Sequence, residues 1–440
     1  MDPATQTHCV LLIDLPPAAL AGIDLPSFTT TPRFRGVKNL PPGLHFVFAA
    51  SDSSLAVRHG AWFYVSPGLG PPQIFVKRWD AQNEELVAET SQTAVMTWRA
   101  NLGSIWKDGL TPYRQTVKSG DTREDADAVE ESSDWSELTE RISPSLLSRI
   151  NGLHPDHWNL SSASSAAQDL ESIPGLESSN TILHPEQELN FLPVDLKRTW
   201  REGATGRERT QAAQDRSWAL GELVERVAEG QGKDLRSREF EILGEIQFCF
   251  LMVLTLNNNS CLEQWKRLLT LLLTCRQAIK ERYNLYIEVL RTLRMQLNHC
   301  GDMEGSMFDM NEHGGGFLKP LLQKFGKGLD ELEFRRKPDM VAEFEEVQEL
   351  VRKEFGWDLD DSRYVKRGMI DLEDGERVEM DMNGADEDDE SGEYAPVVVE
   401  LTRAQLKELK VDSDVAEDSA AAMAESSQDE DDVDQMDMRY

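Results

Sequence analysis

The chain of 440 residues has few cysteines and no apolar run long enough to cross a membrane. Its cysteines are Cys9, Cys249, Cys261, Cys275 and Cys300. This odd number, without a CxxC spacing, predicts small core residues in a reducing compartment rather than a disulfide framework. The longest apolar run, residues 248–256, is about half of a membrane span. The N-terminus also lacks a basic segment followed by a hydrophobic one, so we expect no signal peptide and a soluble intracellular protein.

Basic residues are scarce as well. The chain has 46 Lys and Arg against 79 Asp and Glu, a net charge of −33. Residues 371–440 hold 25 acidic and 5 basic residues, a net charge of −20, which leaves −13 for the preceding 370 residues. A nucleic-acid binder that neutralises phosphates needs a basic surface, so we expect no direct nucleic-acid contact.

The first part of the chain alternates short apolar runs with proline and glycine turns. The runs cover residues 8–13, 44–49, 61–65 and 73–79. Between them stand corners such as Pro41-Pro42-Gly43, which is typical of a β-sandwich or barrel-like domain. Residues 84–102 and 134–150 have helical character. The short apolar run 189–194 predicts a strand that returns to this first domain.

From about residue 205 the apolar period becomes helical. The expected helices cover residues 208–228, 240–256, 283–298 and 338–355. Asn257-Asn258-Asn259 ends the second of them. Ser260 with Glu263 then predicts a capping box at the start of another helix. Short connections between consecutive helices favour a stacked, antiparallel helical domain.

These patterns predict an α+β multidomain chain. Residues 1–196 form an N-terminal, mostly β, sandwich-like domain with a Ser/Ala-rich insertion at 161–180. Residues 197–206 form a linker, and residues 207–358 form an all-α C-terminal domain. Residues 359–440 are an acidic tail with few aromatic residues, which predicts mostly disorder because little apolar surface offsets the ordering entropy.

No group of residues predicts catalysis or metal binding. His154 and His157 flank Pro155-Asp156, but a zinc site needs a further ligand at fixed spacing, and a solvated turn fits the pattern better. Asp14 and Asp24 flank a turn, where such residues are common for backbone reasons. We therefore predict no catalytic, cofactor or metal residue. A small hydrolase that uses the His154 and His157 cluster remains the alternative.

Two further groups could serve binding or regulation. Arg33, Arg35 and Lys38 form a small basic group that either contacts an acidic partner segment or lies along a solvated strand edge. Ser426 and Ser427 each stand three residues before an acidic residue. Acid-directed kinases favour that spacing, so both are candidate phosphorylation sites, although a purely solubilising tail also explains them.

Two blocks of residues, taken in order, carry a family resemblance. The first consists of Gly22-Ile23-Asp24, Phe34-Arg35-Gly36-Val37-Lys38, Pro41-Pro42-Gly43-Leu44-His45-Phe46 and Arg78-Trp79-Asp80. The second consists of Gly244-Glu245-Ile246-Gln247-Phe248-Cys249-Phe250, Glu263-Gln264-Trp265-Lys266-Arg267-Leu268-Leu269, Tyr286-Ile287 and Gln296-Leu297. Together they resemble the Aar-two family of splicing factors, over residues 10–358.

The resemblance implies a mostly β domain joined to a helical domain shaped like a VHS module. It also implies a monomeric, non-enzymatic assembly factor of the U5 snRNP, without a cofactor, in cytoplasm and nucleus. Its partner would be the spliceosome's central scaffold protein, bound through that protein's RNase-H-like and Jab/MPN-like domains. This binding would block premature binding of RNA and of the U5 helicase until assembly is complete. The insertion and the acidic tail depart from the family pattern. A VHS-type trafficking adaptor is a third interpretation, because such adaptors share the helical half.

Overall fold

The structure is a computed structural model of the whole chain. It describes residues 7–52, 57–68, 70–114, 134–152, 154, 158–164, 188–227, 234–300, 315–359, 367–371 and 377–381. Backbone contacts divide the chain into two units, Met1–Asp360 and Asp361–Tyr440. In the second unit the described residues form one antiparallel hairpin, β11 (Arg367–Asp371) with β12 (Arg377–Asp381).

Two five-stranded sheets make up the N-terminal part of the first unit. One has the order β8-β7-β1-β4-β9 and the other β10-β6-β5-β2-β3. The strands are β1 (Cys9–Ile13), β2 (Leu20–Ile23), β3 (Ser27–Thr29), β4 (Gly36–Lys38), β5 (Gly43–Ala50), β6 (His59–Val65), β7 (Ile74–Asp80), β8 (Glu85–Ala88), β9 (Leu110–Pro112) and β10 (Asn159–Ser161). Side chains from both sheets share one buried cluster, so the predicted sandwich is confirmed.

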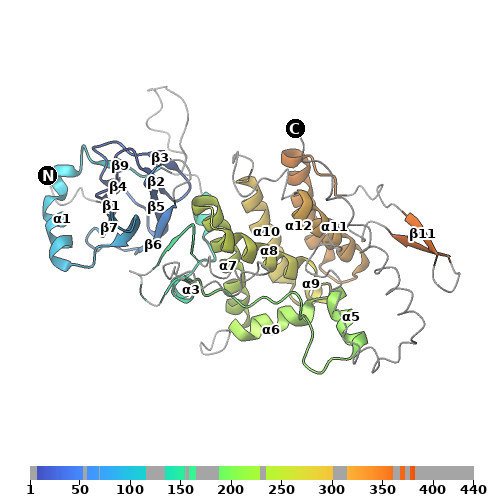
Figure 1. Ribbon diagram of the computed structural model, residues 1–440. Coiled ribbons are helices and arrows are strands. Elements are labelled where there is room, and N and C mark those ends of the chain that lie inside the picture. The colour runs from blue at the N-terminus through green and yellow to red at the C-terminus, as the bar shows by residue number, and fades with distance from the viewer. Residues whose placement is uncertain are drawn as a thin grey trace, which may run out of the picture. The chain divides into compact units, whose positions relative to one another are not determined.

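Alternation along the strands builds a layered structure. Val10 and Leu12 of β1 face the cluster between the sheets, whereas Cys9 and Leu11 face the opposite side. That opposite side is covered by helix α1 (Gln92–Ile105), which lies on the outer side of the sheet (Figure 1). Every residue of β1 is buried as a result, as expected for a strand with both faces covered.

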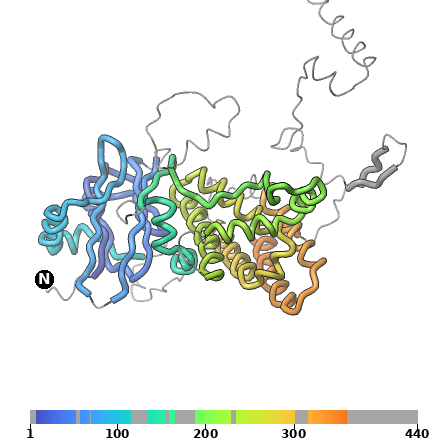
Figure 2. The backbone as a smooth tube through the Cα atoms, turned by 90° about the horizontal axis from the view of Figure 1, so that it is seen from below, coloured from blue at the N-terminus to red at the C-terminus, as the bar shows by residue number. Residues whose placement is uncertain are grey.

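The outer face of the second sheet is covered by helices. The described helices after α1 are α2 (Asp134–Leu138), α3 (Pro144–Ile150), α5 (Gly206–Gln214), α6 (Ser217–Val227), α7 (Leu235–Leu256), α8 (Asn259–Leu273), α9 (Gln277–Glu281), α10 (Tyr283–Asn298), α11 (Gly315–Glu331) and α12 (Lys337–Phe355). Phe46, Phe48 and Trp62 of the sheet belong to the same buried cluster as these helices. Figure 2 shows the sheets followed directly by the helical layers. The α+β fold class is therefore confirmed.

The segment predicted as one helix at 84–102 contains a strand and a helix. Residues Glu85–Ala88 pair with β7 as strand β8, after a turn in which Glu84 has a left-handed backbone with φ of 54°. Helix α1 starts only after Ser91, whose side chain accepts a hydrogen bond from the backbone N–H of Ala94. Strand pairing overrides the helical pattern here because β7 offers an edge.

The strand predicted at 189–194 is absent, although this stretch is described. Its Leu189 and Leu192 are buried, but they pack into the helical cluster. The N–H of Leu192 donates to the Glu245 carboxylate at 3.0 Å, and its carbonyl accepts from Gln264 Nε2 at 2.9 Å. Side chains of α7 and α8 thus replace a neighbouring strand. The strand that returns to the second sheet is β10, paired with β6.

The prediction of a capping box at Ser260 is also wrong. Helix α8 begins two residues earlier than expected, and Asn258 caps it by accepting the N–H of Cys261 at 2.8 Å. Asn257 ends α7 in the left-handed conformation, with φ of 57°, so the asparagine run does break the helix as predicted. The single helix expected at 208–228 is two, α5 and α6, separated at Asp215.

All five cysteines are free and buried, which confirms their prediction as core residues. Helix α10 has the predicted bounds, and α12 begins one residue before the predicted start. Most of the insertion at 161–180 and most of the tail lie outside the described residues, and so do Ser426 and Ser427.

Candidate functional site

The predicted basic group lies on and just before strand β4. Arg33 and Arg35 are exposed, and Arg35 Nη1 donates to the carbonyls of Phe34 and Pro32 at 2.8 and 3.2 Å. Lys38 is half-buried and donates to the Trp106 carbonyl at 2.6 Å, with its ammonium 5.5 Å from that ring. The structure therefore separates the group: the two arginines present cations to solvent, and Lys38 holds the C-terminus of α1.

Asp24 is a structural hub rather than a catalytic acid. Its carboxylate accepts from the N–H of Phe46 at 2.8 Å and from the hydroxyl of Tyr113 at 2.5 Å. His45 Nδ1 lies 2.8 Å from it, while His45 Nε2 lies 2.9 Å from the Pro41 carbonyl. Both of these partners are acceptors, so the arrangement favours the protonated imidazole, in which both ring nitrogens donate. Burial opposes that charge, but the Asp24 charge and hydrogen bond outweigh it and the pKa of His45 is raised.

The histidines predicted as an alternative site do not form one in the described residues. His154 is exposed, and His157 lies outside the described residues. Within the described ranges, no three His, Cys, Asp or Glu side chains are placed to hold a metal ion.

An aromatic cluster joins the sandwich to the helices. The Trp62 ring of β6 is fully buried and lies 4.9 Å from Phe46, 5.8 Å from Trp135 of α2 and 6.1 Å from Phe248 of α7. Trp135 Nε1 donates to the Leu44 carbonyl of β5 at 2.7 Å. Aromatic rings that bury this much surface hold the two parts of the first unit in one arrangement.

A buried ion pair reinforces this junction. Arg149 of α3 donates to Glu245 at 2.6 Å and to Glu241 at 3.1 Å, both on α7. Glu245 is fully buried, and it also accepts from Leu192 N–H and from Gln264 Nε2 at 2.8 Å. Burial disfavours the charged guanidinium. The negative charges and hydrogen bonds of Glu245, and then of Glu241, outweigh burial and raise the pKa of Arg149 above its usual value.

A second polar contact lies where β6, β10 and the α7–α8 turn meet. Arg58 Nη1 donates to the Thr255 carbonyl at 2.9 Å. Asn258 Nδ2 donates to the carbonyls of Ser161 and Ser164 at 2.9 and 3.1 Å. Asn258 thus caps α8 and fastens the first residues of the insertion to the helical part.

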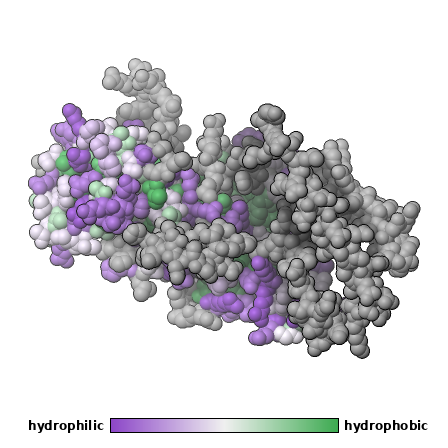
Figure 3. All heavy atoms as spheres, viewed as in Figure 1, coloured by the Kyte–Doolittle hydropathy of each residue, from purple (hydrophilic) through white to green (hydrophobic). Residues whose placement is uncertain are grey.

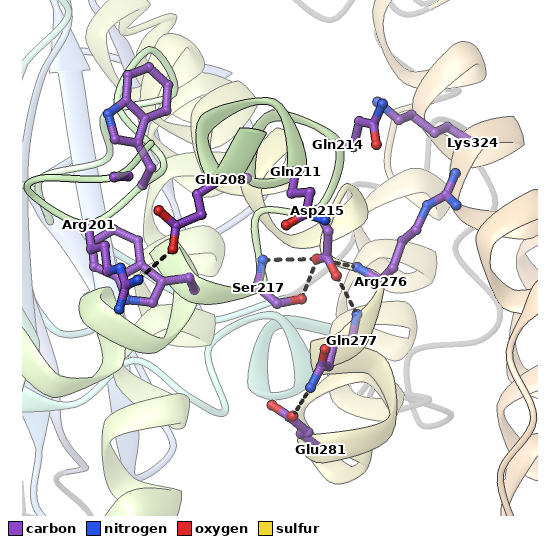
Figure 4. A pocket seen from close by; sticks show the side chains of 14 residues that line it. Arg201, Glu208, Gln211, Gln214, Asp215, Ser217, Arg276, Gln277, Glu281 and Lys324 are labelled. Atoms are coloured by element: carbon purple, nitrogen blue, oxygen red, sulfur yellow. Dashed lines mark hydrogen bonds and ion pairs between the residues drawn. The ribbon is translucent and has the colours of Figure 1, made fainter. Parts of the chain in front are cut away.

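A surface groove of about 1050 Å³ crosses the helical part. Its walls come from the segment before α5, from α5 and α6, and from α9 and α11 (Figure 4). An adjoining cleft of about 420 Å³ shares Trp200 and Trp218 with it. We call the two together the tryptophan groove. Trp218 is 42% exposed, which is unusual for so large an apolar side chain.

Two of the acidic side chains that line this groove, Asp215 and Glu208, are held by internal contacts. Asp215 accepts from the backbone N–H groups of Ser217, Arg276 and Gln277, at 3.0, 2.9 and 3.1 Å (Figure 4). Glu208 forms a capping box with Thr205, and Arg201 donates to it at 2.5 Å. The Thr205 N–H and hydroxyl, together with Arg201, lower the pKa of Glu208 to about 2. Glu208 is therefore ionised, and both carboxylates hold the local fold together.

The sequence interpretation missed this groove. Its available signals were two tryptophans in a polar stretch, Trp200 and Trp218, and the Thr205–Glu208 spacing of a capping box. Neither signal identifies a groove by itself, because the opposite walls come from α9 and α11, which are distant in sequence.

The surface of the sandwich is mixed in character. On the face drawn in Figure 3, hydrophilic side chains separate small hydrophobic patches over the described strands. In the part of the chain that the structure describes, no helix combines the length and the apolar character that crossing a membrane requires.

Comparison with known families covers both parts of the first unit. Residues 6–152 match the family described as the AAR2 N-terminal domain. Residues 191–360 match the AAR2 C-terminal repeat region. The chain belongs to the AAR2 family. The Aar-two resemblance carried by the two residue blocks is thereby confirmed, and an AAR2 N-terminal domain argues against a trafficking adaptor built on the helical half alone.

Relatives within the AAR2 family span most of the chain. It is 28% identical over 381 residues to the Protein AAR2 homolog of Homo sapiens, covering 80% of this chain and 89% of the relative. The homolog of Pongo abelii is 27% identical with the same coverage. That of Caenorhabditis elegans is 24% identical over 307 residues, covering 66% and 78%. AAR2 membership supports a splicing-related assembly role and is compatible with a protein that is not an enzyme.

Proposed function

We propose that the chain is a non-enzymatic assembly factor of the spliceosomal U5 snRNP. In this proposal it binds the central scaffold protein of the spliceosome through that protein's RNase-H-like and Jab/MPN-like domains. While bound, it keeps RNA and the U5 helicase from engaging too early. It acts as a monomer, in the cytoplasm and in the nucleus. The observation that carries the proposal is the match to both AAR2 regions, in order, on one two-part body.

The junction supports a steric mechanism. A factor that blocks two sites at once must keep its two parts at a fixed separation, because a hinge would let either site reopen. The Trp62 cluster and the Arg149–Glu245 pair bury the contact between the sandwich and the helices. Such a body can present a composite surface of the size that stable complexes need, roughly 1,200–2,000 Å² in total.

Charge supports the same proposal. The first 370 residues carry −13 and the remaining 70 carry −20. In this proposal the RNA-binding surface of the scaffold is basic. The chain can occupy that surface because it is negatively charged, as RNA is. Phosphorylation of Ser426 and Ser427 would add further charge at the tail and is the proposed trigger of release.

The test is to capture the scaffold from cytoplasmic extract with the full-length tagged chain and to identify the captured proteins by mass spectrometry. We expect the scaffold and U5 proteins without the helicase. Failure of the wild-type chain to capture the scaffold would refute the proposal. A second assay measures RNA binding by the purified scaffold domains, and unchanged RNA affinity with the chain bound would refute the blocking mechanism.

Matched variants test whether Arg33 and Arg35 contact the scaffold. Arg33→Glu with Arg35→Glu should weaken scaffold capture, because both arginines face solvent. The control is Lys327→Glu with Arg335→Glu, the same charge change at exposed positions of the helical part. Lys38 is left intact because it holds Trp106. Equal capture by both double variants would remove the arginines from the interface and leave the function standing.

A further inference from the structure

The corner Pro41-Pro42-Gly43 joins strands β4 and β5, and His45 fastens it to the sandwich. The Pro41 carbonyl lies 2.9 Å from His45 Nε2. Pro41 and Pro42 are exposed, and neither has a backbone N–H with which the corner could be held. A Cβ built at Gly43 would meet no atom within 4 Å, so the corner ends in open space. The contact between His45 and the Pro41 carbonyl is therefore well placed to decide whether the corner stays in position.

The other side of the same imidazole faces a buried carboxylate. His45 Nδ1 lies 2.8 Å from Asp24 Oδ2, and this oxygen also accepts the hydroxyl of Tyr113 at 2.5 Å. His45 and Asp24 are 2% and 0% exposed, so water does not replace either partner. The ring also packs against Phe63 and Tyr113, with 5.5 and 5.4 Å between ring centres. Of the groups in contact with the imidazole, Asp24 and Tyr113 are titratable, and Asp24 supplies the negative charge.

The two contacts of the imidazole cannot both survive the loss of its proton. Only the protonated ring donates from both nitrogens at once. In the neutral ring the remaining proton stays on Nδ1, because the charged Asp24 carboxylate is a stronger acceptor than a carbonyl. Nε2 then presents a lone pair to the Pro41 carbonyl oxygen at 2.9 Å, and the two acceptors repel each other. The corner is the part that yields, since Asp24 is buried and Gly43 lies in open space.

We propose that His45 is a proton-operated tie, which fastens the Pro41-Pro42-Gly43 corner when its imidazole is charged and releases the corner when it is neutral. Burial opposes the charge, but the Asp24 charge, the Asp24 hydrogen bond and the Pro41 carbonyl outweigh it, so the pKa of His45 lies above 6.5. The corner is therefore fastened below about pH 6.5 and is released as the pH rises through the folded pKa. The inference does not rest on the proposed function, because it concerns the sandwich alone.

The experiment follows the full-length chain by NMR, with nitrogen-15 in histidine and glycine, from about pH 6 to about pH 9, a range that begins near the ordinary histidine pKa. The ring nitrogen shifts report which nitrogen of His45 carries a proton, and His45→Gln identifies those signals. We expect Nε2 to lose its proton while Nδ1 keeps its own, and the Gly43 amide signal to move with the same midpoint. A neutral ring at the lowest pH, loss of the Nδ1 proton first, no titration in this range, or a Gly43 signal that does not follow the ring would overturn the proposal.

Two variants should move the midpoint in opposite directions, which damage to the fold cannot do. Asp24→Asn removes the negative charge but suits the left-handed backbone, with φ of 56°, so the midpoint should fall by about one pH unit or more. Tyr113→Phe removes a competing donor from Asp24 Oδ2, so the carboxylate holds the imidazolium more strongly and the midpoint should rise. His154→Gln is the control, because His154 is exposed, and it should leave the midpoint unchanged. Equal midpoints for the wild type and Asp24→Asn, or shifts of the same sign in both variants, would refute the assignment.

Discussion

The buried pair between Arg149 and Glu245 gives the sharpest prediction about the junction. Replacing Arg149 with methionine keeps much of the side-chain volume but removes the cation. Glu245, which is fully buried, then keeps only the neutral donors of Leu192 and Gln264. Removing one member of a buried pair leaves an uncompensated charge, which costs about 3–5 kcal/mol. We expect Arg149→Met to lower the free energy of unfolding by that amount at neutral pH.

The assay is urea unfolding followed by tryptophan fluorescence, which reports on the junction because Trp62 and Trp135 lie in it. Adding Glu245→Gln to Arg149→Met should recover about 2 kcal/mol, since a neutral amide oxygen can still accept from Leu192. The matched control is Arg291→Met, whose pair with Glu343 is half exposed and should cost about 1 kcal/mol or less. A cost below about 1 kcal/mol for Arg149→Met, or no recovery in the double variant, would refute the reasoning.

Three further predictions concern the sandwich. Gly36→Ala should destabilise the fold by at least about 2 kcal/mol in thermal melts, because a Cβ there would lie 2.0 Å from a backbone oxygen of β1. The control is Gly103→Ala in helix α1, which has open space around it. This variant should be neutral or stabilise the fold by about 0.5–1 kcal/mol. Trp135→Phe should cost about 1–2 kcal/mol more than Trp62→Phe by urea unfolding. Among the described residues the Trp135 N–H has an acceptor, at 2.7 Å, and the Trp62 N–H has none. Equal costs would contradict this. The raised pKa of His45 means that its ion pair contributes fully below about pH 6.5, the unfolded value, and is lost as the pH rises through the folded pKa. Melting temperature should therefore fall on the alkaline side, and His45→Gln should flatten that slope; an unchanged slope would show that His45 is not charged in the fold.

Local patterns in the sequence determined much of the secondary structure. The apolar runs between proline and glycine corners became strands, because alternation and turn residues act over a few positions. The helical period at 283–298 gave α10 within its observed bounds for the same reason. The two residue blocks also identified the family without any knowledge of the fold.

Where a local pattern had two possible partners, sequence reasoning failed. The run at 189–194 reads as a strand, but its N–H and carbonyl groups bind Glu245 and Gln264 of the helices. Asn258, rather than Ser260, caps α8, because its amide can also bind the carbonyls of Ser161 and Ser164. Each choice depends on a residue more than fifty positions away.

The sequence by itself therefore determined the class of each half of this protein, its family and the acidic character of its tail. Only the tertiary structure decided that the outer face of the second sheet is covered by helix α7, that Glu245 is neutralised by Arg149, and that Trp200 and Trp218 line one groove. The physical reason is the distance along the chain over which each effect acts. Propensity and periodicity are set by neighbours in the chain, whereas burial, ion pairing and surface grooves are set by which distant elements pack together.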